Sequence, residues 1–187
     1  MKKFYLLVFL FTLGKVYSQK LIVTPEGLRD SLNVEKNYVV IEVKGKKAKQ
    51  LYNLCVDFVN NKYKNSKEAM NSIPIDGEFF SYKTEIPVFQ LTNNGKFIVK
   101  SLKQSIEYDT ELSFKDGYIK YEIKKLHMYM RDVEVLFKGS SWTDTAIYNK
   151  SNKLIMKAAK DNLETHFFSI INEIKDYIKV NENKNKW

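Results

Sequence analysis

The sequence predicts an α+β domain in which a curved antiparallel sheet carries two main helices on one face, in the order β-α-β-β-β-β-α. Three observations lead to this fold class. A run of β-branched residues precedes a stretch with helical periodicity, the middle of the chain alternates apolar and polar residues, and the C-terminal part carries a long apolar stripe at helical spacing. Helices covering one face of an antiparallel sheet would bury all three patterns together.

Residues 1–18 have the pattern of an export signal. Lys2 and Lys3 form a positive start before an apolar run of ten residues, Phe4–Leu13. Val16-Tyr17-Ser18 then offers small or tolerated residues for cleavage. A membrane-spanning helix needs about twenty apolar residues, so we expect cleavage near Ser18 rather than an anchor. The sequence therefore predicts an exported protein, periplasmic or secreted, with no transmembrane segment in its mature chain.

The mature chain is expected to begin with a small element ahead of the domain. Residues 19–36 are predicted to form an N-terminal arm or a short helix, because Thr24-Pro25-Glu26 places a proline at a helix start. A single α+β domain is expected over residues 37–180. Its first strand is Tyr38–Val43, and its first helix runs from about Lys47 to Tyr63, where apolar residues recur three and four positions apart.

Antiparallel strands are predicted for the centre of the domain. One strand covers Glu78–Ile86, and Asn93-Asn94-Gly95 indicates a turn. The alternation over Ser105–Phe114 leads into a second turn at Asp116-Gly117. A two-residue type I′ turn there sets the register of the hairpin. The opposed pairs are then Lys115 and Tyr118, Phe114 and Ile119, Ser113 and Lys120, Leu112 and Tyr121, Thr110 and Ile123, and Asp109 and Lys124.

The C-terminal third is expected to hold one long helix. Arg131–Asn149 has no clear period and is predicted to be a long connection. A helix follows from about Asn152 to Val180, and residues 181–187 form a polar tail. The apolar stripe of this helix consists of Met156, Ala159, Leu163, Phe167, Ile170, Ile174 and Tyr177.

The chain is basic, but its charge does not indicate a nucleic-acid partner. The formal net charge is +9, and three of the lysines lie in the export signal, which leaves +6 for the mature chain. Arg29 and Arg131 are the only arginines, whereas bidentate recognition of bases and phosphates relies chiefly on arginine. The lysines are scattered, so we expect a solvated surface and no nucleic-acid binding. Lysine-mediated binding of an anionic envelope polymer is a further alternative.

No residue pattern predicts a catalytic, metal or cofactor site. The carboxylates of the predicted hairpin face lysines across it, so ion pairing explains them. The two histidines, His127 and His166, and the single cysteine, Cys55, lack the spacing of known metal sites. Gly139-Ser140-Ser141-Trp142 is not the nucleophile elbow of hydrolases, because the second glycine is missing. We therefore expect no metal and no cofactor, and identify no catalytic residue.

Aromatic residues are numerous, with 12 tyrosines and 12 phenylalanines in the chain. Several of them have no helical stripe to explain them. Such residues would suit a groove between the sheet and the long helix, or a partner-binding surface, although ordinary sheet packing is the competing explanation. The candidate binding residues are Tyr82, Phe89, Tyr121, Tyr129 and Trp142.

From Gly27 to Tyr177 the chain resembles a known family. The likeness rests on Tyr38-Val39-Val40-Ile41-Glu42-Val43 with Gly45, on Leu51-Tyr52, on Asn65–Met70 with Ser66 where a proline is usual, and on Asp116–Tyr121. These motifs resemble domain of unknown function 4468, a family of exported proteins of Gram-negative bacteria with a fold like the TATA-binding protein. The resemblance implies this fold and an envelope location. It implies no activity, and the fold name brings no DNA binding with it.

These observations favour an uncharacterised exported domain that is a binding module rather than an enzyme. We expect it to use its sheet–helix face to bind a protein, a peptide or a small ligand. The alternative is an envelope enzyme whose site assembles from distant residues around His127, together with Tyr129 and Arg131.

Overall fold

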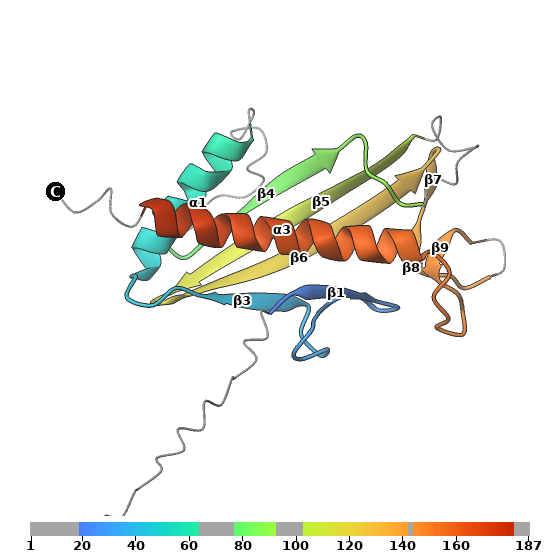
Figure 1. Ribbon diagram of the computed structural model, residues 1–187, viewed down its shortest axis with the longest axis horizontal. Helices are drawn as coiled ribbons and strands as arrows, with labels where there is room; N and C mark the ends of the chain where they lie inside the picture. Colours follow the sequence, from blue (N-terminus) through green and yellow to red (C-terminus); the bar gives the residue numbers. More distant parts are fainter. Residues whose placement is uncertain (1–18, 64–76, 93–102, 142–143, 182–187) are drawn as a thin grey trace, which may run out of the picture.

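The structure is a computed structural model, and it describes residues 19–63, 77–92, 103–141 and 144–181 (Figure 1). Several sequence-based predictions concern residues outside these ranges. They are the export signal over residues 1–18, the segment Asn65–Met70, the turn at Asn93-Asn94-Gly95, the candidate binding residue Trp142, and the tail beyond residue 181.

One antiparallel sheet of five strands forms the main layer, in the order β3-β6-β5-β4 with β7 paired to β6 (Figure 1). Helices α1 and α3 lie on the same side of this sheet. The predicted α+β fold class, with two main helices on an antiparallel sheet, is confirmed. The strands are β3 (Tyr38–Glu42), β4 (Phe79–Ile86), β5 (Gln104–Lys115), β6 (Tyr118–Met130) and β7 (Val133–Glu134); the helices are α1 (Ala48–Lys62) and α3 (Lys157–Asn181).

The register of the central hairpin is as predicted from the turn up to a bulge. Phe114 pairs with Ile119, Leu112 with Tyr121, and Thr110 with Ile123. The register then shifts between Tyr108 and Thr110, so that Tyr108 pairs with Leu126. The predicted pairing of Asp109 with Lys124 is therefore replaced, and Asp109 lies 3.6 Å from Lys125 instead. A bulge adds one residue to one strand, which a two-residue alternation cannot reveal.

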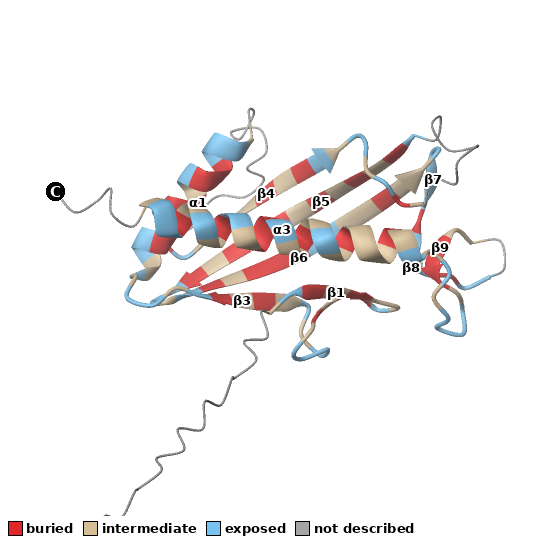
Figure 2. Ribbon diagram, in the orientation of Figure 1, coloured by how far each residue is buried: buried red, intermediate tan, exposed pale blue. Residues whose placement is uncertain are grey.

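The helices bury one face of the main sheet, which we call the covered face (Figure 2). The predicted stripe of α3 lies in this core, with Leu163, Phe167 and Ile174 fully buried. Helix α1 adds a second apolar face, which includes the buried Cys55. Burial raises the pKa of the Cys55 thiol, so the thiol is inert. No helix within the described residues is long and apolar enough to cross a membrane.

The N-terminal segment is a β-hairpin, which corrects the prediction of an arm or a short helix over residues 19–36. Strands β1 (Leu21–Thr24) and β2 (Gly27–Asp30) pair antiparallel. Pro25 lies in the turn, where the Thr24 hydroxyl donates a hydrogen bond to the carbonyl of Gly27 at 2.9 Å. Gly27 has φ of 107°, a conformation that ends a helix but suits a tight turn. Because β1 packs against α3, tertiary contact overrode the local helix signal.

The predicted long connection over Arg131–Asn149 contains three short strands instead. They are β7, β8 (Leu136–Lys138) and β9 (Ala146–Tyr148). Strands β8 and β9 form a separate parallel pair. Each is too short to show a period, and each is stabilised by hydrogen bonds to another segment, such as that from the Met156 amide to the Ile147 carbonyl at 3.1 Å. This region closes one end of the sheet, beside the first turn of α3 (Figure 1).

Candidate functional site

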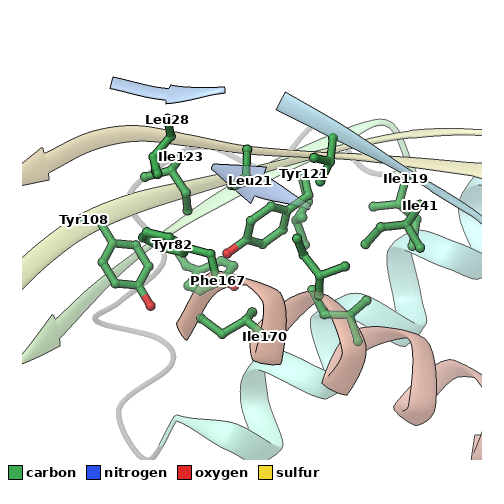
Figure 3. Close-up of a cluster of buried hydrophobic side chains, with 14 of the residues drawn as sticks. Leu21, Leu28, Ile41, Tyr82, Tyr108, Ile119, Tyr121, Ile123, Phe167 and Ile170 are labelled. Carbon is green, nitrogen blue, oxygen red and sulfur yellow. The ribbon is translucent and has the colours of Figure 1, made fainter. Parts of the chain in front are cut away.

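The structure places two of the five candidate aromatic residues in the closed core. Tyr82 on β4 and Tyr121 on β6 are both 0% exposed. Figure 3 shows their rings between the sheet and α3, beside Phe167. Burial raises the pKa of both hydroxyls well above the ordinary value for tyrosine. The covered face therefore has no open groove at these residues, and they hold the core together.

Phe89 and Tyr129 lie apart from these two and from each other. Phe89 follows β4 and packs edge-to-face on the ring of His166, with centroids 5.5 Å apart. Tyr129 is on the opposite face of the sheet, which we call the outer face, where its ring stacks on that of His127 at 6.4 Å. Trp142 is outside the described residues. The structure thus does not bring the predicted binding residues together at one site.

His127 has an acidic partner but no cleft. Its Nδ1 lies 2.9 Å from a carboxylate oxygen of Glu134, and both side chains are close to half exposed. Arg131, the third residue of the hypothetical enzyme site, is exposed and sits in a tight turn with φ of 58°. Among the described residues, His127 does not line the cavities found before α1 and at the end of the sheet. The arrangement is a surface ion pair beside a turn.

The outer face is not a basic surface. Four of its lysines each lie within 4 Å of a carboxylate oxygen of the same face. The lysines are Lys83, Lys120, Lys124 and Lys125, and the carboxylates are Glu85, Glu107, Asp109, Glu111 and Glu122. Mutual pairing of this kind leaves little net field for a polyanion to recognise.

The lysines before α1 form a small cavity of about 360 Å³ whose anionic partner belongs to the chain itself. Asp116, from the β5–β6 turn, accepts hydrogen bonds from the Lys47 ammonium at 2.8 Å and from the Ala48 amide at 2.9 Å. Both interactions lower the pKa of Asp116, the one with Lys47 most strongly. The carboxylate thus occupies the N-terminal end of the helix, where an external anion would otherwise bind. We interpret this cluster as a structural contact that links the β5–β6 turn to the segment before α1.

The best candidate for a binding site is a cavity of about 470 Å³ at the end of the sheet, beside the start of α3. Its apolar part comes from segments far apart in the sequence, including Met130 at the end of β6 and Met156 before α3. Its size falls within the range of small-ligand and side-chain pockets. The lining residues are Thr92, Met130, Gly139, Ser141, Asp144, Thr145, Ala146, Tyr148, Asn149, Ile155 and Met156.

A tight loop forms the polar rim of this cavity. The carboxylate of Asp144 accepts hydrogen bonds from the Ser140 and Ser141 amides, at 2.6 and 2.9 Å, and from both serine hydroxyls. These donors lower the pKa of Asp144 to about 2, with the two backbone amides contributing most, so the carboxylate is ionised at neutral pH. A Cβ at Gly139 would lie 3.2 Å from that of Asp144 and 3.3 Å from that of Ala146, so a larger residue there would require these neighbours to shift by a few tenths of an ångström. The loop is therefore closely packed at this glycine.

The wall of the cavity is anchored in the core. Tyr148 on β9 donates a hydrogen bond through its hydroxyl to the carbonyl of Val23 on β1, at 2.8 Å. The amide of Gly139 donates to the carbonyl of Tyr148 at 2.9 Å. These bonds connect the wall of the cavity to β1, a strand from the opposite end of the chain.

The chemistry of the cavity suits binding. The described lining residues supply one carboxylate, already occupied by four donors, and the hydroxyls of serine, threonine and tyrosine, and they include no histidine or cysteine to act as a base or nucleophile. Among the described residues, no group of three potential metal-ligating side chains is close enough to hold a metal ion. Sequence reasoning missed this site because its apolar residues follow no period. The available signal was the turn Gly139-Ser140-Ser141 followed by Asp144.

Comparison with known proteins gives structural neighbours only. No family model matches the chain, and no curated protein matches it. The chain is similar to a DUF4468 family protein from Bacteroides ovatus ATCC 8483, with 18% identity, a TM-score of 0.48, and coverage of 76% of this chain and 82% of that one. It is also similar to a TBP-like protein from Parabacteroides distasonis ATCC 8503, with 17% identity, a TM-score of 0.44, and coverage of 78% and 91%. The neighbours have the names that the sequence resemblance predicted, and that prediction is confirmed.

Proposed function

We propose that this chain is an exported, non-enzymatic binding module that holds an apolar side chain of a protein or peptide partner in the cavity at the end of its sheet. The observation that carries the proposal is the cavity of about 470 Å³ itself, with apolar walls and a polar rim. The sequence favoured the sheet–helix face as the binding surface. We place the binding site at the end of the sheet instead, because Tyr82 and Tyr121 on the sheet–helix face are fully buried.

The surroundings of the cavity favour a peptide over a compact small molecule. Ile155, which lines the cavity, is 57% exposed, and Val133 and Leu136 are further exposed apolar residues of the same end of the molecule. Strand β7 carries Val133 and pairs with Met130 of the cavity wall, and Leu136 on β8 pairs with Ala146. A small ligand would use only the cavity, whereas a peptide would place one side chain in it and cover exposed apolar residues around it.

A selection with random peptides tests the binding proposal. The mature chain, residues 19–187, is immobilised and used to enrich displayed peptides of about twelve residues. We expect enriched sequences to share a large apolar residue, because the walls contain Met130, Ala146 and Met156. Ile155→Asp places a charge at the mouth, and its affinity for the enriched peptides should fall at least about tenfold, since an unpaired charge facing an apolar group is unfavourable.

The matched control is Val88→Asp, which introduces the same charge at an exposed apolar residue after β4. Both variants are first checked for wild-type circular dichroism and melting temperature. The control should bind the peptides as tightly as wild type. Failure to enrich any common sequence, or equal binding by Ile155→Asp, would contradict the proposal.

The export part of the proposal has its own test. Gln19, the residue after the predicted cleavage point, is bonded to the domain through its side-chain amide: Nε2 donates to the Asp30 carboxylate at 2.6 Å, and Oε1 accepts from the Val40 backbone amide at 3.1 Å. Expression of the full chain in a Gram-negative host should give a periplasmic or secreted protein whose mass corresponds to residues 19–187. A full-length product that stays in the cytoplasm would contradict export without affecting the binding test.

A further inference from the structure

Two thioether side chains line the cavity at the end of the sheet. Met130 ends β6 and Met156 precedes α3, and both are partly buried. Met128, two residues before Met130 on the same strand, is 1% exposed and lies in the core instead. Thioethers make favourable contacts with aromatic rings, and the flexible methionine side chain adapts to the shape of its partner. These walls therefore favour an aromatic occupant over a purely aliphatic one.

Tyr148 on β9 contributes to the same wall. This residue is 9% exposed, and its hydroxyl donates to the carbonyl of Val23, so the hydroxyl is not free to donate to a ligand. A second aromatic ring placed against Tyr148 would gain from edge-to-face or offset-stacked contact, beyond the area that it buries. Tyr148 thus favours the same class of occupant as the two methionines.

The rim of the cavity presents a carboxylate that can accept one more hydrogen bond. Oδ2 of Asp144 accepts three, from the Ser140 amide and hydroxyl and from the Ser141 amide. Oδ1 accepts one, from the Ser141 hydroxyl at 2.9 Å. Each carboxylate oxygen has about two lone-pair positions, so Oδ1 retains one with respect to the described residues. The donors are all neutral, so they leave the negative charge of Asp144 in place.

Asn149, another polar residue of the rim, has no such capacity at its side-chain oxygen. Its Oδ1 accepts hydrogen bonds from the Ser151 and Lys153 amides, both at 2.9 Å. Two donors fill the two lone pairs of an amide oxygen. We therefore expect a donor on an incoming ligand to bond to Asp144, since hydrogen bonds to an ionised acceptor are the stronger ones.

We propose that the side chain held in this cavity is a tryptophan or tyrosine of the peptide partner, with its ring against Met130 and Met156 and its N–H or O–H group donating to Asp144. This inference rests on the proposed function and specifies the chemistry of the partner. Tryptophan and tyrosine combine a large apolar ring with a donor that needs an acceptor when buried. Phenylalanine and leucine lack the donor, and lysine lacks the ring.

Methyl NMR of the mature chain with isotope-labelled methionine tests this inference. The probes are the N-acetyl amides of tryptophan, tyrosine, phenylalanine, leucine and lysine. The ring currents of the tryptophan and tyrosine amides should shift the Met130 and Met156 methyl resonances, whereas the buried Met128 resonance should stay in place. The phenylalanine amide should bind about tenfold more weakly than the tyrosine amide, because it makes no hydrogen bond to the charged acceptor.

Variants of the cavity separate the two parts of the inference. Met130→Leu and Met156→Leu keep the volume, and each should weaken binding of the tryptophan amide at least about twofold without weakening the leucine amide. Met128→Leu is the matched control and should change neither. Asp144→Asn should remove the preference for tyrosine over phenylalanine. The titrations of the wild-type chain do not depend on the folding of this variant.

Two results would overturn the inference. One is binding of the leucine or lysine amide as tight as that of the tryptophan amide, or a common aliphatic residue in the selected peptides; the binding proposal would then stand with a different partner. The other is failure of every probe to move the Met130 and Met156 resonances. In that case the peptide selection and Ile155→Asp would still decide the proposed function on their own.

Discussion

The main sheet presents tyrosines and threonines to helix α3 on its covered face, and lysines and carboxylates to the opposite side on its outer face. On the outer face the polar groups find partners across the strands, as in the pair of Lys83 and Glu107 at 2.6 Å. On the covered face the Tyr82 and Tyr121 hydroxyls lie near the neutral hydroxyl of Thr110 and have no charged partner among the described residues. The difference shows that the strand register pairs opposite charges on the outer face, whereas on the covered face it brings together neutral hydroxyls under the helix.

The largest effect is expected from the apolar packing of the covered face. Phe167 is 0% exposed, and its ring contacts that of Tyr108 with centroids 5.2 Å apart. Phe167→Ala should lower the free energy of unfolding by about 3–5 kcal/mol, because it leaves a cavity in the core. Urea denaturation measures this loss. The control Phe168→Ala changes the next residue, which is only partly buried, and should lose clearly less. Equal losses would show that α3 does not pack by the face described.

The half-buried His166 of α3 makes the stability of the covered face depend on pH. Burial and, to a smaller extent, Lys62 lower the pKa of His166 to about 4, with Glu173 opposing them. The unfolded side chain titrates near 6.5, so between these values the unfolded chain binds a proton that the folded chain does not. This contribution is complete above pH 6.5 and is lost as the pH falls through 4. The free energy of unfolding should fall by on the order of 2 kcal/mol across this window.

Urea denaturation between pH 7.5 and 4 measures that slope. His166→Gln removes the titrating ring and should flatten it. His127→Gln makes the same change on the outer face, beside Glu134, and should leave the slope in place. A slope that persists in His166→Gln, or disappears in His127→Gln, would reverse the assignment of the two histidines.

Glu122 is the one outer-face carboxylate that is almost fully buried, with its side chain 3% exposed. Burial alone would raise the pKa of Glu122. The Lys120 and Lys124 ammonium groups, at 2.5 and 2.6 Å, lower it by a larger amount, so the net shift of the pKa is downward. Its contribution to stability is therefore present above pH 4.5 and is lost as the pH falls below that value. At neutral pH, Glu122→Gln should cost about 1–2 kcal/mol by chemical denaturation. The control Glu111→Gln, with a more exposed side chain, should cost less.

The smallest effect is expected from an exposed ion pair of the outer face. Lys83 lies 2.6 Å from Glu107 and 3.2 Å from Glu85. Lys83→Ala should lower the melting temperature by less than about 2 °C at low salt, because exposed pairs contribute little. The difference should shrink further in about 1 M NaCl, where charges are screened within a few ångströms. A large, salt-independent loss would mean that the outer face is covered by another part of the chain.

Local pattern was sufficient for the elements that repeat over many residues. The stripe through Leu163 and Phe167 predicted α3, and the turn at Asp116-Gly117 predicted the pairing of Phe114 with Ile119. In both cases the information lies within a few residues of the element it predicts. The bulge at Tyr108, the hairpin of β1 and β2, and the short strands β7 to β9 were missed, because each is too short or too irregular to show a period.

The candidate site, like these missed elements, could not be predicted from local pattern. The sequence identified Tyr82 and Tyr121 as aromatic residues without a helical stripe, but burial is a property of what packs on them, and α3 covers both completely. The cavity joins Met130, Ala146 and Met156, which are brought together by strand pairing and by the packing of α3 against the sheet. Periodicity along one chain segment therefore predicted which residues face inward. The position of the cavity at the end of the sheet depended on contacts between segments, which no local pattern encodes.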